Sequence, residues 1–292
     1  MEFATRPINP SDPGFMQTPV ASVACIKVEE GQSRPFDDLL AAEEPLEIRL
    51  VYGADRVVKP VTVTMRTPGN DFELAVGFLF TEGILQSWSD VKLIRYCSDS
   101  GKRTENNNVV KVEMQPQVTV DVSGLERNFY TTSSCGVCGK SSMDSVRRFC
   151  APSDASFSIK SEMITRLPEL LKSNQVVFKR TGGLHAAALV SSEGQLLLVR
   201  EDVGRHNALD KIIGAAFSSG QTPLNNHILV LSGRISFELV QKAAMAGIGA
   251  IVAVGAPSSL AVDLAKSLNL TLIGFVRDQH FNVYCGADRI IF

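Results

Sequence analysis

The chain has 292 residues, of which 45% are hydrophobic and 21% are charged, and its 29 basic and 31 acidic side chains leave a net charge of −2. This composition is typical of a globular protein and excludes the disordered class with low hydrophobicity and high charge. The small net charge disfavours nucleic-acid binding through a broad basic face. The length allows one large domain or two modest ones, and we expect two unequal lobes.

The apolar stretches predict neither a membrane span nor a secretory signal. The longest nearly apolar stretch, residues 246–257, contains three glycines and is shorter than the ~20 residues of a spanning helix. Residues 1–20 are rich in proline and lack an apolar core, so they read as a flexible tail and not as a signal peptide. We therefore expect a cytoplasmic protein that binds no membrane.

A small α+β lobe is predicted over residues 21–125. Residues 46–52 and 61–65 are β-branched or alternate between apolar and polar types, and Gly53-Ala54-Asp55 between them is turn-like. This pattern predicts a β-hairpin.

The next segment of this lobe has the apolar spacing of a helix. Between Phe72 and Phe80, apolar residues recur three and four positions apart, which predicts a helix with Asn70 or Asp71 as its N-cap and Gly83 at its end. Two further strands are predicted at residues 92–97 and 109–114.

A larger α/β lobe is predicted over residues 126–292. Two apolar runs, 186–190 and 195–199, predict a hairpin, and Asn207 is the expected N-cap of a helix over 208–217. Strands and helices then alternate in a pattern that predicts a βαβαβ unit with a parallel sheet. The strands are expected at 228–231, 250–254 and 270–276, and the helices at 237–246 and 260–268.

Three loops follow the carboxyl ends of these parallel strands, where open sheets bind their ligands. The loops are residues 232–234, 255–259 and 277–280. Their glycines permit close backbone approach, the following helices offer free N–H groups, and Arg234 and Arg277 suit phosphate. The pattern favours a nucleotide or another phosphorylated ligand, although turns and helix caps also require glycine, proline and serine. Neither a P-loop sequence nor a G-x-G-x-x-G sequence after a strand is present.

The segment Cys135-Gly136-Val137-Cys138-Gly139 places two thiols on a glycine-flanked loop. A following helix N-terminus and Lys140 would stabilise a thiolate at Cys138. Three functions are open: a zinc site, for which the four ligands are not all evident; a thioredoxin-type redox pair; and a catalytic cysteine that carries sulfur as a persulfide.

Two further polar clusters precede structural elements of the larger lobe. His185 stands just before a strand, a position where a lone histidine is more often a packing residue. Residues 200–207 place five ionisable groups ahead of Asp210 and Lys211. This second cluster is denser than helix capping requires.

These segments together resemble the formate dehydrogenase accessory sulfurtransferase family, the FdhD proteins, over roughly residues 40–290. The matching motifs are Met65-Arg66-Thr67-Pro68-Gly69, Glu73-Leu74-Ala75, Thr81-Glu82-Gly83-Ile84, the cysteine segment 135–139, Thr181-Gly182-Gly183-Leu184-His185, the segment 200–211 and Ser232-Gly233-Arg234-Ile235-Ser236.

The resemblance implies a sulfurtransferase that takes sulfur from a cysteine desulfurase and passes it to the molybdenum cofactor, bis-molybdopterin guanine dinucleotide, for formate dehydrogenase. Cys135 matches the persulfide-carrying cysteine of the family, and Cys138 would be its catalytic partner. A homodimer is also implied. The segment implied to contact the cofactor consists of Phe275, Val276, Arg277, Asp278, Gln279 and His280.

The resemblance also implies a fold: a cytidine-deaminase-like three-layer α/β lobe beside the smaller N-terminal α+β lobe. The deaminase signature H-x-E followed by P-C-x-x-C is absent, because Ser134 replaces the proline and Ala187 stands where the acid would be. We therefore expect no resident metal. Asp278 stands where the family commonly has glycine, and its charge would repel a nearby phosphate. The alternative function is a non-catalytic chaperone that binds the cofactor or the apo-dehydrogenase.

Overall fold

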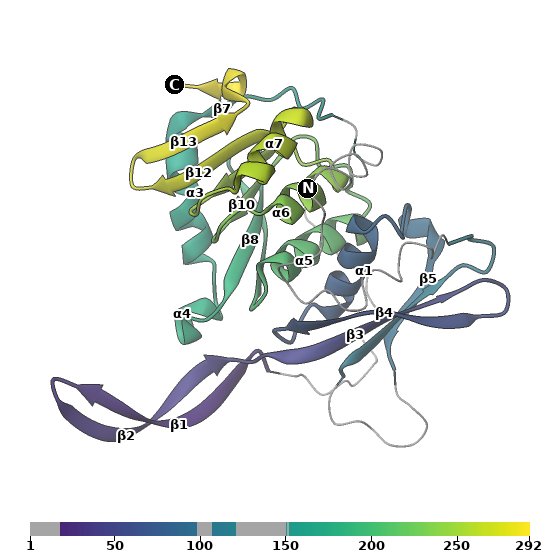
Figure 1. Ribbon diagram of the computed structural model, residues 1–292, viewed down its shortest axis with the longest axis horizontal. Helices are drawn as coiled ribbons and strands as arrows, with labels where there is room; N and C mark the ends of the chain where they lie inside the picture. The colour runs from purple at the N-terminus through teal and green to yellow at the C-terminus, as the bar shows by residue number, and fades with distance from the viewer. Residues whose placement is uncertain (1–17, 98–106, 121–149, 151) are drawn as a thin grey trace.

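The structure, a computed structural model, describes residues 18–97, 107–120, 150 and 152–292 (Figure 1). The described chain is a mixed α/β protein with two main sheets. One has four strands in the order β4-β3-β6-β5, and the other has six in the order β13-β12-β11-β10-β8-β9. A two-stranded ribbon projects away from both sheets (Figure 1).

The four-stranded sheet confirms the elements predicted for the N-terminal part. β3 (Glu44–Tyr52) and β4 (Val57–Arg66) form the expected antiparallel hairpin. β5 (Val91–Tyr96) pairs antiparallel with β6 (Val109–Met114), and β6 pairs parallel with β3. α1 (Asp71–Thr81) packs on this sheet, so that apolar side chains of β3, β6 and α1 share one buried cluster.

Helix α1 meets α5 (Arg205–Ser218) backbone to backbone. A Cβ atom added to Gly77 would lie 1.9 Å from the carbonyl oxygen of Asp210, and one added to Gly214 would lie 1.9 Å from that of Glu73. Phe217 of α5 belongs to the buried cluster of the four-stranded sheet. The two parts of the molecule are therefore joined by a helix pair whose closest approach requires glycine.

The six-stranded sheet confirms the predicted hairpin and the predicted βαβαβ unit. β10, β11 and β12 are parallel, whereas β8 runs antiparallel to β10 and makes the sheet mixed. The elements are β8 (His185–Ser191), β9 (Leu196–Asp202), β10 (His227–Leu231), α6 (Phe237–Met245), β11 (Ala250–Ala253), α7 (Ser259–Ser267), β12 (Thr271–Arg277) and β13 (His280–Cys285).

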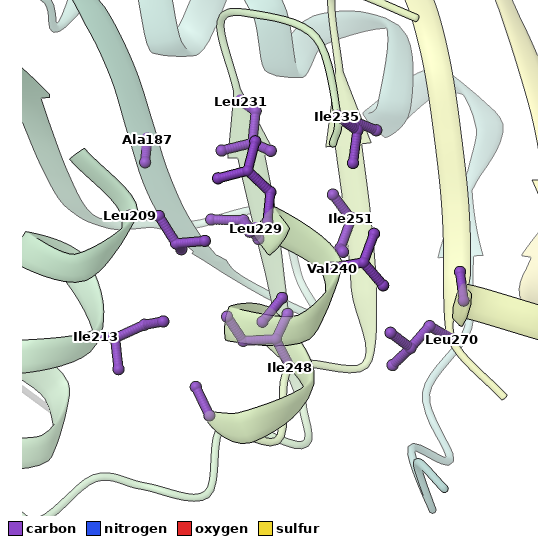
Figure 2. Close-up of a cluster of buried hydrophobic side chains, with 14 of the residues drawn as sticks. Ala187, Leu209, Ile213, Leu229, Leu231, Ile235, Val240, Ile248, Ile251 and Leu270 are labelled. Atoms are coloured by element: carbon purple, nitrogen blue, oxygen red, sulfur yellow. The ribbon is translucent and has the colours of Figure 1, made fainter. Parts of the chain in front are cut away.

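Helices cover both faces of this sheet and give it three layers. On one face, α5, α6 and α7 bury a cluster against β8, β10 and β11. Figure 2 shows Leu209 of α5 pointing toward Leu229 of β10, with Val240 of α6 beside Ile251 of β11. On the other face, α3 (Ser161–Ser173) packs through Ile164 and other apolar residues onto the same strands.

The prediction that Asn207 caps a helix over 208–217 is wrong. The helix begins at Arg205, and its N-cap is Gly204. The Asn207 amide instead donates to the carbonyl oxygen of Met65 (2.7 Å) and to Asp202 Oδ1 (3.0 Å). Asn207 is therefore a link to β4 and not a cap.

The ribbon, helix α3 and strand β13 are not among the predicted elements. The ribbon consists of β1 (Val20–Glu29) and β2 (Gln32–Ala41), and it exposes apolar side chains such as Ile26 and Val28. Residues 1–17 of the expected tail lie outside the described residues. The remaining short elements are η1 (Trp88–Asp90), β7 (Ile159–Lys160), α4 (Phe178–Thr181), η3 (Ala287–Arg289) and β14 (Ile290–Ile291).

Candidate functional site

Several strand ends and helix starts meet at one edge of the six-stranded sheet. The parallel strands β10, β11 and β12 end there. Because β8 is antiparallel to β10, it begins at this edge, where His185 pairs with Asp202 at the end of β9. Helices α5 and α6 start from the same edge. We call the polar side chains that collect here the polar edge: His185, Arg205, His206, Arg234 and Ser236.

Three glycines at this edge allow neighbouring loops to touch. A Cβ atom on Gly255 would lie 2.7 Å from the carbonyl of Gly233, and one on Gly274 would lie 3.0 Å from the carbonyl oxygen of Gly255. A Cβ atom on Gly233 would lie 3.1 Å from His185 Nδ1. Packing between neighbouring segments therefore explains these glycines, of which Gly233 and Gly255 were expected to allow close approach of a ligand.

The two histidines of the polar edge are held neutral. Burial, together with the charges of Arg205 and Lys242, lowers the pKa of His206 to about 4. Burial also lowers the pKa of His185, with help from the charges of Arg205 and Arg234. At neutral pH both imidazoles can therefore accept a hydrogen bond as well as donate one.

His206 and Ser236 are hydrogen-bonded, but they do not form a catalytic triad. Nε2 of His206 lies 3.1 Å from Ser236 Oγ. The nearby carboxylate of Glu238 lies 3.9 Å from the same nitrogen. In a triad the acid must orient the opposite ring nitrogen, so this arrangement does not support a serine nucleophile.

The two arginines of the polar edge have no ion-pair partner within the described part of the chain. The guanidinium Nε of Arg205 is buried and has no hydrogen-bond partner there either. Arg234 is exposed. Arg234 is a predicted phosphate ligand, whereas Arg205 was singled out only as a member of the 200–207 cluster.

Most other charges of that cluster hold the protein together. Arg200 makes two hydrogen bonds to Glu73 of α1, at 2.6 and 2.7 Å. Glu201 accepts hydrogen bonds from the first backbone N–H groups of α4. The fully buried pair of Asp202 and Lys211 is 2.7 Å apart and also bonds the backbone of Thr67. This fixes the turn between β9 and α5 against the N-terminal part.

Two serines that begin helices differ in what their side chains do. Ser258 caps α7, because its Oγ accepts a hydrogen bond from the backbone N–H of Ala261 at 3.2 Å. Ser236 makes no such cap on α6, and its hydroxyl bonds His206 instead. For Ser258 the capping interpretation holds, whereas Ser236 is part of the polar edge.

The segment implied to contact the cofactor lies at the end of β12 and in the turn to β13. Phe275 is 43% exposed and has a φ of 56°, which is unusual for an aromatic residue. Val276 is fully buried, so its side chain faces the core. The backbones of Arg277 and His280 are opposite each other in the antiparallel pairing of β12 and β13.

The turn residues Asp278 and Gln279 line a shallow groove together with helix α3. Helix α3 covers the sheet face opposite to α6 and α7. The three parallel strands end at the same edge. The turn after β12 nevertheless lies beside α3, whereas β10 and β11 are followed by α6 and α7 on the other face of the sheet.

The predicted catalytic residues Cys135 and Cys138, and Lys140 beside them, lie outside the described residues. Among the cysteines that are described, Cys25 is exposed and Cys150 is buried. Burial raises the pKa of Cys150 to about 11, so it stays a thiol. The described ranges contain no group of three metal-ligating side chains.

Comparisons with known proteins give the family. The profile of the FdhD/NarQ family matches residues 41–291. The chain belongs to the FdhD/NarQ family. The sulfur carrier protein FdhD of Streptomyces coelicolor is 51% identical over 269 residues, covering 91% of this chain and 93% of that protein. The sulfur carrier protein FdhD of Sulfurisphaera tokodaii is 40% identical over 272 residues, covering 93% and 99%.

A solved structure shares the fold of this FdhD/NarQ chain. A crystal structure from Desulfotalea psychrophila, provisionally assigned as a formate dehydrogenase accessory protein, superposes with a TM-score of 0.70 at 24% identity, covering 93% of this chain and 99% of that chain. The sequence resemblance to the FdhD family is thus confirmed. No helix in the described segments is long and apolar enough to cross a membrane.

Proposed function

We propose that this chain is a cytoplasmic sulfurtransferase that accepts sulfur from a cysteine desulfurase as a persulfide on Cys135. The observation that carries the proposal is the similarity to sulfur carrier proteins over nearly the whole chain, together with the cysteine pair in the matched region. The Cys135 thiolate attacks the outer sulfur of the desulfurase persulfide, an S–S bond forms on Cys135, and the desulfurase thiolate leaves.

The acceptor proposed for this sulfur is the molybdenum cofactor, bis-molybdopterin guanine dinucleotide, which is then inserted into formate dehydrogenase. The exposed ring of Phe275 and the guanidinium of Arg277 at the end of β12 suit a planar base and a phosphate. A second copy of the chain is the further partner implied by the family resemblance. The same resemblance supports a cytidine-deaminase-like topology for the six-stranded sheet and its helices.

Cys138 is proposed as the residue that releases the sulfur. Its thiolate can attack Sγ of Cys135, form a disulfide with it and expel the outer sulfur as hydrosulfide, so that the two cysteines supply the two electrons. After loading, when the desulfurase and cysteine have been removed, a Cys138→Ala variant is then expected to keep its persulfide, whereas the loaded wild type loses it with time and gains a disulfide.

The proposal is tested by intact-mass spectrometry after incubation with a cysteine desulfurase and cysteine. The wild type is expected to gain about 32 Da, the mass of one sulfur atom, and Cys135→Ala is expected to gain nothing. Cys25→Ser is the matched control, because Cys25 is an exposed thiol in the ribbon. An adduct that disappears in Cys25→Ser and survives in Cys135→Ala would overturn the assignment. No adduct on any variant would favour the cofactor-binding chaperone.

A further inference from the structure

The ribbon of β1 and β2 has little packing of its own. The two strands pair along their whole length, from Val20 opposite Ala41 to Glu29 opposite Gln32. Eight of the ten residues of β1 are exposed, and no residue of either strand is buried. A two-stranded ribbon alone is only marginally stable in water and needs a further packing surface. The single chain therefore leaves this element incomplete.

The two faces of the ribbon differ in charge. Residues directly opposite each other in an antiparallel pair, such as Ile26 and Pro35, point to the same face. The apolar face consists of Val20, Ser22, Ala24, Ile26, Val28, Ser33, Pro35, Asp37, Leu39 and Ala41. Asp37 is its one charged residue. The charged face consists of Ala21, Val23, Cys25, Lys27, Glu29, Gln32, Arg34, Phe36, Asp38 and Leu40.

The charged face makes its own contacts, whereas the apolar face toward the tip does not. Lys27 and Arg34 both form an ion pair with Glu29. The same two cations lie over the ring of Phe36, at 5.2 and 5.6 Å from its centroid. On the apolar face, Ile26 is 64% exposed and Val28 is 65% exposed. A contiguous apolar surface of this kind is typical of an interaction site.

The chain itself covers the apolar face only at its base. A Cβ atom added to Gly183, just after α4, would lie 3.6 Å from the Cβ atom of Ala41. Leu39, next along this face, is half-buried. Farther out, at Ile26 and Val28, no described segment covers the face, and Figure 1 shows the tip of the ribbon pointing away from the rest of the chain. The face that meets α4 therefore continues uncovered toward the tip.

The size of this face favours a second copy of the chain as its cover. A strand of ten residues is roughly 33 Å long and a ribbon of two strands roughly 10 Å wide. One ribbon laid on a foreign protein would bury about 650 Å² in total, which is less than the roughly 1,000 Å² of a specific interface. Two ribbons exchanged about a two-fold axis would bury about 1,300 Å², which is within the range of stable interfaces.

We propose that the ribbon is a dimerisation arm, and that a second copy of this chain covers its apolar face. Each copy lays its ribbon on the body of the other, so that Ile26 and Val28 are removed from water in both. The charged face stays in solvent, where its ion pairs need no further partner. The inference rests on the proposed function where that function names a second copy of the chain, and it adds the surface.

Sedimentation equilibrium of the full chain tests the arm. The wild type is expected to be a dimer. Ile26→Lys puts a charge into the apolar contact and is expected to raise the dissociation constant roughly a hundredfold or more. Val23→Lys is the matched control, because Val23 is an exposed residue of the same strand but lies on the charged face, opposite Asp38. It is expected to leave the dissociation constant unchanged.

Equal dissociation in Ile26→Lys and Val23→Lys would assign the effect to the folding of the ribbon and overturn the role of the apolar face. A dimer that survives Ile26→Lys would overturn it as well. Hydrogen exchange supplies a second measurement, since the amides of residues 20–29 are expected to exchange slowly in the wild-type dimer and fast in Ile26→Lys. Fast exchange of this segment in a wild-type dimer would place the interface elsewhere and overturn the proposal.

The mass adduct on Cys135 is measured on the same samples, so that the two proposals can fail separately. Absence of the adduct in an intact dimer would refute the sulfur carrier alone. A monomeric wild type that carries the adduct would refute the dimerisation arm alone.

Discussion

Residues of β9 and α5 contribute charged side chains to two regions of the molecule. The regions differ in whether these charges are paired. We call the first region the seam network, and it lies between the N-terminal part and the six-stranded sheet. It consists of two ion pairs, Arg200 with Glu73 and Lys211 with Asp202. In the polar edge, the buried Nε of the neighbouring Arg205 has no hydrogen-bond partner in the part that the structure describes. Pairing, and not residue type, therefore distinguishes the charges of the seam network from that of Arg205.

The largest expected effect comes from breaking the seam network at Lys211. Lys211→Met removes the cation that faces the fully buried Asp202, which leaves that carboxylate uncompensated. We expect the free energy of unfolding to fall by about 3–5 kcal/mol, measured by urea denaturation. Lys27→Met, in an exposed pair on the ribbon, is the control and should leave the midpoint unchanged. A midpoint shift as small for Lys211→Met as for Lys27→Met would contradict the role of the seam network.

A smaller loss is expected at the contact between α1 and α5. Gly214→Ala places a Cβ atom against the backbone of Glu73, and the helices must separate to admit it. We expect a destabilisation of about 1–3 kcal/mol, although an exposed helical glycine normally gains about 1 kcal/mol from this change. Ser218→Ala near the end of the same helix is the control. If Gly214→Ala is as stable as the wild type or more stable in thermal denaturation, the two helices can separate at little cost in free energy.

The third prediction concerns the pH dependence of the polar edge. The pKa of His206 is lowered to about 4 in the folded protein, from 6.5, mainly by burial. The unfolded chain therefore binds more protons between these values, so the contribution of this residue is complete above pH 6.5 and is lost as the pH falls toward 4. His206→Gln should reduce the slope of the free energy of unfolding against pH in this range. Urea denaturation at a series of pH values measures that slope. Identical slopes for variant and wild type would refute the buried, neutral state of His206.

The smallest expected effect is at Phe275, whose backbone is in the left-handed region. Asparagine tolerates this conformation better than alanine does. Of two variants that both lose the ring, Phe275→Asn should therefore be more stable than Phe275→Ala, by about 0.5–1 kcal/mol. Thermal denaturation of the pair isolates the backbone from the side chain. A more stable alanine variant would show that the backbone relaxes when the ring is removed.

Much of the six-stranded sheet could be predicted because its signals are local. The strands of the βαβαβ unit are short apolar runs, and the helices between them repeat apolar residues at helical spacing. Helix α3 carries a similar signal in Ile164, Leu167 and Leu171, and an explicit test of that spacing would have found it. The ribbon gives a weaker signal, because most of its side chains are exposed, including the apolar Ile26 and Val28, so no face buried within the chain imposes an alternating pattern on its sequence.

The division of charges between the seam network and the polar edge could not be predicted from the sequence. Asp202 bonds Thr67, which is 135 positions away, and Arg200 bonds Glu73, which is 127 positions away. Only the folded arrangement shows that the buried Nε of Arg205 lacks a hydrogen-bond partner within the described ranges. Asn207 was misassigned for the same reason, since its contacts with β4 lie far along the chain. The roles of Cys135 and Cys138 stay predictions.

The close packing of loops at the strand ends has a consequence for the entropy of binding. The backbone N–H of Gly255 donates to the carbonyl oxygen of Gly233, and that of Phe275 donates to the carbonyl oxygen of Gly255, each at 3.2 Å. Two loops and the end of β12 are thus joined by hydrogen bonds before any ligand arrives. A ligand that spans Arg234 and Phe275 would meet a preorganised surface, and ordering the loops would cost little of its binding free energy.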